Sequence, residues 1–101
     1  MKFGLSDMTI KKIHSVFQKH THIDQAVVYG SRAKGNYRPG SDIDLTLYGD
    51  NLDQRQCSNI AEELDELLLP YMIDLSVFEQ LKHADIKAHI QRVGKVFYHR
   101  P

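Results

Sequence analysis

One stretch near the middle of the chain, from Gly30 to Asp44, constrains the fold more than any other. Residues 26–29 before it form a short apolar run, Ala-Val-Val-Tyr, that predicts a buried strand, and Gly30 allows a sharp turn at its end. Ser31 can then cap a short helix. Backbone N–H groups at a helix start are unpaired and lie at the positive end of the helix dipole, so they favour a phosphate group. The stretch therefore predicts a strand, a turn and a helix start that binds phosphate.

Two carboxylates follow ten residues later, in Asp42-Ile43-Asp44. Polar residues at 42, 44 and 46 alternate with apolar residues at 43, 45 and 47, which predicts a strand with both carboxylates on one face. Two like charges held so close repel each other unless a divalent cation neutralises them. Mg²⁺ or Mn²⁺ suits such oxygen ligands and could bind triphosphate oxygens at the same time. Asp42 and Asp44 are therefore candidate catalytic and metal-binding residues for nucleotidyl transfer.

A third carboxylate is expected on a neighbouring strand, because two-metal phosphoryl chemistry uses a further acid to hold the second ion or to accept a proton. Asp74 meets this requirement. It lies in the otherwise apolar, strand-like run of residues 71–78, where a lone acid would be costly to bury without a partner. Across the sheet from Asp42 and Asp44 it would have one, and we predict that it completes the catalytic and metal-binding set.

These motifs resemble the signature of a known family, the minimal nucleotidyltransferases (MNT domains) of the DNA polymerase beta superfamily. That signature is Gly-Ser, ten residues and Asp-x-Asp, with a later strand acid. The resemblance extends over roughly the whole chain, including a closing strand near residues 94–98. It implies a polymerase beta-like α/β fold, ATP as substrate and two Mg²⁺ ions, with Mn²⁺ as the alternative. The matching residues are Gly30 and Ser31 for the nucleotide, and Asp42, Asp44 and Asp74 for catalysis and metal.

Three cations, Arg32, Lys34 and Arg38, lie between the two halves of the motif. They could grip the triphosphate or could equally be solubilising loop charges. Motif position alone favours Arg32 as a nucleotide-binding residue. An alternative for the motif as a whole is that Asp42 only caps a turn and Gly30 serves an ordinary connection.

Length and composition limit the number of domains, the binding partners and the location to be expected of this chain. The 101 residues predict one domain, 1–101, with a single core. Thirteen basic and thirteen acidic residues give no general attraction to a nucleic-acid template or an anionic membrane. Cys57 is alone, and no segment reads as a membrane span or a signal peptide. We therefore expect a cytoplasmic protein.

Hydrophobic periodicity predicts a small mixed sheet packed by helices. We expect helices over residues 7–20, 53–69 and 85–93, and strands over residues 25–29, 42–47, 71–78 and 96–98. Asp53 with Gln56 resembles a capping box, and Leu67 and Leu68 are expected to face inward. The last strand is expected at an edge of the sheet.

The 101 residues leave no room for a second domain, so we expect the acceptor pocket to come from another molecule. Family resemblance implies that the acceptor hydroxyl comes from a small helical HEPN protein, with AMP transferred to its tyrosine in a toxin-antitoxin pair. We therefore expect a hetero-oligomer with such a partner. Two alternatives stay open: transfer to a small-molecule hydroxyl, such as that of an aminoglycoside, with the acceptor site built by a second chain, and a non-catalytic nucleotide-binding module.

Overall fold

Four strands form one sheet in the spatial order β3-β2-β1-β4. The computed structural model describes all residues, 1–101. β1 pairs antiparallel with β2 and with β4, and β2 pairs parallel with β3, so the predicted mixed sheet is confirmed. In chain order the elements are α1 (Asp7–Gln18), β1 (Gln25–Tyr29), α2 (Ser31–Lys34), β2 (Ile43–Tyr48), α3 (Gln54–Asp65), β3 (Ile73–Val77), η1 (Phe78–Gln80), α4 (Ala84–Val93) and β4 (Lys95–His99).

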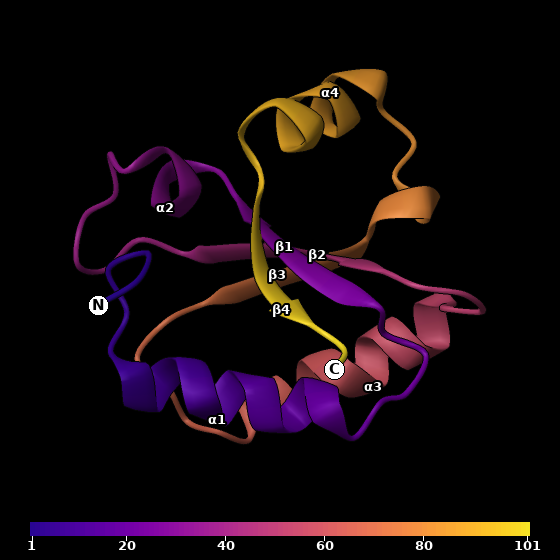
Figure 1. Ribbon diagram of the computed structural model, residues 1–101, viewed down its shortest axis with the longest axis horizontal. Coiled ribbons are helices and arrows are strands. Elements are labelled where there is room, and N and C mark those ends of the chain that lie inside the picture. Colours follow the sequence, from indigo (N-terminus) through magenta and orange to yellow (C-terminus); the bar gives the residue numbers. More distant parts are fainter.

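The hydrophobic core lies on one face of the sheet, beneath α1 and α3 (Figure 1). Alternate residues of β2 point into it, because side chains along a strand face opposite sides in turn. Ile43, Leu45 and Leu47 are fully buried. They pack against helical residues that recur at helix spacing, which include Ile13, Phe17, Ile60 and Leu64.

The opposite face of the sheet is covered mainly by α4 (Figure 1). A smaller apolar cluster of Val27, Tyr29 and Ile90 joins α4 to β1. The intervening residues of β2, beginning with Asp44, face this side, since Ile43 and Leu45 occupy the core side. The polar residues of the motif therefore lie outside the main core, beside a single helix.

Two of the three predicted helices are shorter than the periodicity indicated, while α4 begins one residue earlier than expected. α1 ends at Gln18 and α3 ends at Asp65, so the expected extension of α3 to residue 69 is wrong. Leu68, expected to face inward, is 87% exposed and has a φ of 55°. Pro70 disfavours the helical conformation at Leu69, and the positive φ of Leu68 already lies outside the helical region, so the helix cannot run to residue 69. No helix is long and apolar enough to cross a bilayer.

α3 begins with the expected capping box. The Asp53 carboxylate accepts a hydrogen bond from the Gln56 backbone N–H at 2.8 Å, and the Gln56 side chain accepts one from the Asp53 N–H at 3.1 Å. Both bonds satisfy N–H groups that have no partner within the helix. This start matters for the site, because α3 connects β2 to the parallel strand β3.

We expect Asp53→Ala to lower the free energy of unfolding by about 0.5–2 kcal/mol, since it removes the helix cap. Urea unfolding followed by circular dichroism measures this loss. Asp50→Ala is the matched control, because Asp50 is an exposed carboxylate in the preceding turn with no cap to lose. Equal unfolding midpoints for the two variants would contradict the prediction.

Candidate active site

The Gly-Ser turn lies at the end of β1, where Gly30 precedes the short helix α2. Gly30 has φ 72° and ψ −152°, a conformation that only glycine adopts readily. This conformation turns the chain from the buried strand so that Ser31 begins α2. The predicted strand, turn and helix start are confirmed, but the prediction that Ser31 caps the helix is wrong: Gly30 is the N-cap residue, and no side chain caps this helix start.

The two strand carboxylates lie opposite each other. β2 and β3 pair in parallel register, and Asp44 is the register partner of Asp74. Neighbouring strands lie about 4.8 Å apart, so the two side chains share one face and one position along the sheet. Asp74 is exposed, Asp44 is half-buried, and Asp42 is exposed at the residue before β2. The fold therefore places all three acids at one end of the β2–β3 pair.

Gly30 and Asp44 touch directly. The antiparallel β1–β2 pairing places Tyr29 beside Asp44. A Cβ atom on Gly30 would lie 2.5 Å from Asp44 Oδ2, closer than real Cβ contacts. The space beside Gly30 is thus filled by the carboxylate, and the Gly-Ser turn and the acidic strand form one continuous site.

The charges of this site interact. Burial raises the pKa of Asp44 above its usual value of 3.8, and the nearby Asp74 and Asp42 carboxylates raise it further. His89 on α4 opposes this rise in the pKa of Asp44. Such crowding of carboxylates is the arrangement that a bound cation relieves.

The donor set fits Mg²⁺ or Mn²⁺ in chemistry, because carboxylate oxygens are hard ligands. The side chains do not form a ready-made cage, since no group of three His, Cys, Asp or Glu residues is positioned to hold a metal ion. Asp44 and Asp74 would instead turn toward an ion between them. The register of β2 and β3 puts both carboxylates within reach of one ion, and their mutual repulsion favours its binding.

Two residues that the sequence interpretation missed also line the site. Tyr29 and His89 meet edge to face, with ring centroids 6.1 Å apart. Burial raises the pKa of the Tyr29 phenol; a hydrogen bond with Ser76 lowers it, and Asp74 and Asp44 raise it. The position of His89 could have been found, because it shares the helix face of Ile86, Ile90 and Val93.

A ladder of paired side chains leads away from the acids along β2 and β3. Thr46 is the register partner of Ser76, and the Ser76 hydroxyl donates a hydrogen bond to Thr46 Oγ1 at 2.9 Å. Beyond them the rings of Tyr48 and Phe78 stack with centroids 4.7 Å apart. The buried Thr46 is thus satisfied within the sheet, and the acidic pair is the open end of the ladder.

Arg32 requires a correction. The sequence suggested a phosphate contact, but only 2% of this residue is exposed. Its guanidinium donates hydrogen bonds to the backbone carbonyls of Phe3, Pro39 and Ser41 at 2.8–3.3 Å. A group held in this way faces the interior of the chain, so the structure gives Arg32 a structural role; Lys34 and Arg38 are exposed.

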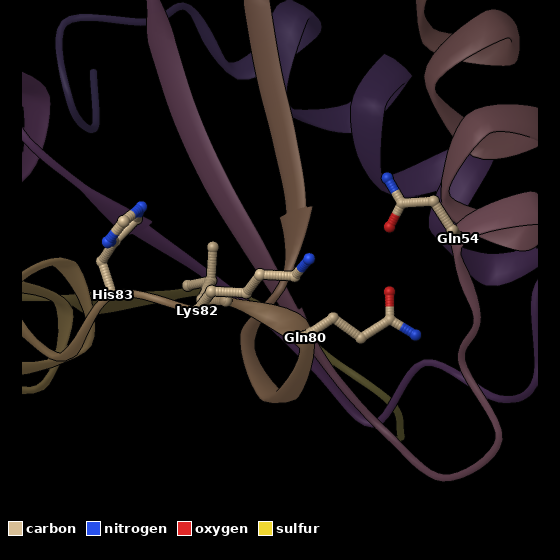
Figure 2. Close-up of a pocket in the computed structure, with 5 residues that line it drawn as sticks. Gln54, Gln80, Lys82 and His83 are labelled. Carbon is tan, nitrogen blue, oxygen red and sulfur yellow. The ribbon is translucent and has the colours of Figure 1, made fainter.

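The largest hollow in the surface is separate from the acids. It measures about 690 Å³ and lies beside η1, between the start of α3 and the start of α4. Figure 2 shows the side-chain amides of Gln54 and Gln80 pointing toward each other across it. Because β3 runs from Asp74 toward η1, this hollow lies at the opposite end of the strand. It takes no part in the site described above.

A mixed sheet with a Gly-Ser turn beside two strand carboxylates, Asp44 and Asp74, and a third at Asp42 just before β2 defines a nucleotidyltransferase. The sequence matches the family described as "Polymerase beta, Nucleotidyltransferase" over residues 11–101. The chain therefore belongs to this family. A search of curated proteins by sequence found no match.

Solved structures show the same fold. The chain matches a toxin-antitoxin complex with AMP-PNP, with a TM-score of 0.73 and 19% identity, covering 90% of this chain and 73% of the other. A Shewanella oneidensis MNT antitoxin in complex with a tri-AMPylated HEPN toxin matches with a TM-score of 0.70 and 16% identity, covering 95% and 74%. A toxin-antitoxin MntA-HepT complex gives a TM-score of 0.69 at 16% identity, covering 94% and 74%. At these identities the likeness concerns the fold.

We expect Gly30→Ala to destabilise the chain by about 1–3 kcal/mol, because the backbone conformation is strained for alanine. The added methyl group would also displace the Asp44 carboxylate. Urea unfolding measures the loss. Gly40→Ala is the matched control, since a Cβ there meets nothing within 4 Å and its backbone is not in the left-handed region. A Gly30 variant as stable as the control would refute this account of the turn.

We expect Asp44→Asn to make the unliganded protein more stable at neutral pH. A carboxylic acid whose pKa is raised in the folded state loses stability as pH rises through the interval between its unfolded and folded pKa values. The difference in stability between the variant and the wild type should therefore be largest at neutral pH, and it should vanish below pH 3.8, the usual pKa of this carboxyl. Thermal melts across this range measure it, with the exposed Asp65→Asn as control. A variant less stable than wild type at neutral pH would overturn the assignment.

Proposed function

We propose that this chain transfers AMP from ATP to a hydroxyl group of a partner protein, in a reaction that depends on Mg²⁺. The observation that carries the proposal is the Asp44–Asp74 pair facing the Gly30–Ser31 turn. The turn offers free backbone N–H groups to phosphate, and the carboxylates lie where a metal-bound phosphate would meet them.

The reaction joins the acceptor oxygen to the α-phosphorus of ATP and breaks the bond to the bridging oxygen, so pyrophosphate leaves. Gly30 and Ser31 hold the triphosphate, and Asp42 and Asp44 would hold the Mg²⁺ that neutralises its charge. Asp74 is exposed and can accept the proton of the attacking hydroxyl or hold the second ion. Bound Mg²⁺ would supply charge neutralisation at the phosphate oxygens.

The acceptor comes from outside the chain in this proposal. Asp42 and Asp74 are both exposed, and no segment of residues 1–101 covers them. Transfer requires a hydroxyl held in line with the α-phosphate and a site from which water is excluded. A docked protein can supply both.

Exposed apolar side chains on the segment that leads into β3 support protein docking. Met72, two residues before Asp74, is 73% exposed, and Leu68 is 87% exposed. Such residues on the segment that leads into a catalytic strand favour contact with an apolar partner surface. The chain shares its fold with MNT antitoxins that form complexes with HEPN toxins, one of them tri-AMPylated. A tyrosine of a HEPN-type helical protein is therefore the acceptor that we propose, with this chain as its antitoxin.

The test is transfer to the co-purified helical partner. Incubation with ATP and Mg²⁺ should add AMP to the partner, measured by its intact mass. Asp74→Asn should slow transfer by about 10²–10⁴-fold, as expected for loss of proton transfer, and Asp42→Asn and Asp44→Asn should slow it by orders of magnitude. Asp85→Asn, an exposed acid on α4, is the control and should not change the rate.

Two results would contradict the proposal. A partner that binds yet never gains AMP with fresh ATP and Mg²⁺ would leave a non-catalytic binding role. AMP found on an added aminoglycoside, and not on the protein, would favour a small-molecule hydroxyl as the acceptor.

A further inference from the structure

The buried guanidinium of Arg32 joins four segments of the chain that are distant in sequence. It leaves α2 next to Ser31 and donates to Phe3 O at 2.8 Å in the N-terminal segment. In the loop before β2 it donates to Ser41 O at 2.8 and 3.1 Å and to Pro39 O at 3.3 Å. The ring of Tyr71, before β3, lies 4.9 Å from the guanidinium carbon.

The contacts of Arg32 do not include an acidic partner. Its charge is met by carbonyl dipoles and by the faces of Tyr71 and Tyr37, the latter at 5.3 Å. Removing a charge from water is costly, and a planar guanidinium with several donors can recover that cost only if its partners hold fixed positions. The arrangement therefore ties the position of the loop to the position of Arg32.

The segments that meet at Arg32 lead directly into the candidate site. Ser31 precedes it, Asp42 follows the bound carbonyl of Ser41, and Asp74 lies three residues after Tyr71. The Ile43 N–H also donates to Met72 O at 2.9 Å, which joins the start of β2 to the start of β3. Any shift at Arg32 is thus passed on to the turn and to the ends of the two strands that carry the acids.

The N-terminal segment, residues 2–5, packs against Arg32 and Tyr37. Lys2 and Leu5 form an isolated bridge, with Phe3 and Gly4 at φ values of 55° and 71° between them. Gly4 packs against the Tyr37 ring so closely that an added Cβ would collide with it. Figure 1 shows this N-terminal turn beside the segment between α2 and β2.

We propose that Arg32 is a positioning residue for nucleotidyl transfer, and that residues 2–5 form a clasp that holds it in place. Arg32 does not touch the nucleotide. It fixes the loop of residues 35–42 against the start of β3, so that Asp42 and Asp74 face the Gly-Ser turn. The effect of Arg32 on catalysis rests on the proposed function, whereas its effect on the position of the loop rests on the contacts described above.

Local hydrogen exchange tests the geometry without nucleotide. In Arg32→Met, amides of residues 36–44 should exchange faster by about tenfold or more, while those of β1 stay protected. Arg100→Met is the matched control: Arg100 also donates to a carbonyl, Thr21 O at 2.6 Å, and pairs with Asp24, but none of its contacts is in the site. Unchanged exchange over residues 36–44 in a folded Arg32 variant would overturn the proposal.

Gly4→Ala tests the contact between the N-terminal segment and the loop without changing Arg32. It leaves Arg32 intact but should displace Tyr37, so it should loosen residues 36–44 in the same way. If Arg32→Met does not fold, this variant decides: a folded Gly4→Ala with wild-type exchange in the loop refutes the clasp. Arg32→Lys should restore only part of the protection, because one ammonium cannot serve three carbonyls in their fixed positions.

Catalysis gives the second readout. With ATP present, Arg32→Met should raise the Mg²⁺ concentration needed for half-maximal transfer, whereas Arg100→Met should not. Equal Mg²⁺ requirements in the two variants would show that Arg32 acts on stability alone and would overturn its positioning role. A wild-type chain that transfers no AMP would refute the proposed function, and hydrogen exchange would then decide the role of Arg32.

Discussion

The parallel pairing of β2 with β3 is the constraint on which the candidate site depends. Its register brings Asp44 and Asp74 to the same position along the sheet, although thirty residues separate them in sequence. A shift of one residue would move Asp74 to the core face, because strand side chains alternate. Leu45 and Val77 on the core side prevent that shift, since both are buried in the hydrophobic cluster. The core thus sets the geometry of the carboxylates on the other face.

Two features of the site lower the stability of the folded chain. Asp44 is half-buried beside two like charges, and Gly30 holds a conformation closed to other residues. Neither feature favours folding by itself, and the proposed function gives both a use, since a cation and a phosphate would compensate them. Their cost is offset by the core beneath α1 and α3, which contains neither Asp44 nor Gly30.

Much of this arrangement could be predicted from the sequence, because the relevant signals are local. The β1 strand, the Gly30 turn, the alternation of β2 and the capping box at Asp53 each depend on neighbouring residues. Arg32 and Leu68 could not be placed in the same way. A loop arginine is usually exposed, and only the distant carbonyl of Phe3 and the ring of Tyr71 reveal why this one is buried. Leu68 fits the apolar periodicity of α3, but the helix ends at Asp65, before it reaches this residue.

The crossover through α3 has a consequence for folding. Asp44 and Asp74 meet only after residues 49–72 have closed into a loop around α3, and such non-local contacts form slowly because the entropy of loop closure opposes them. The paired residues of β1 and β2 are closer in sequence, from 15 residues apart at Tyr29–Asp44 to 23 at Gln25–Tyr48, so this pair can form earlier. A partly folded chain would thus carry the Gly-Ser turn without the complete carboxylate set. Under the proposed function, such an intermediate would have the residues that hold the nucleotide but not those that act on it, so transfer would require the complete sheet.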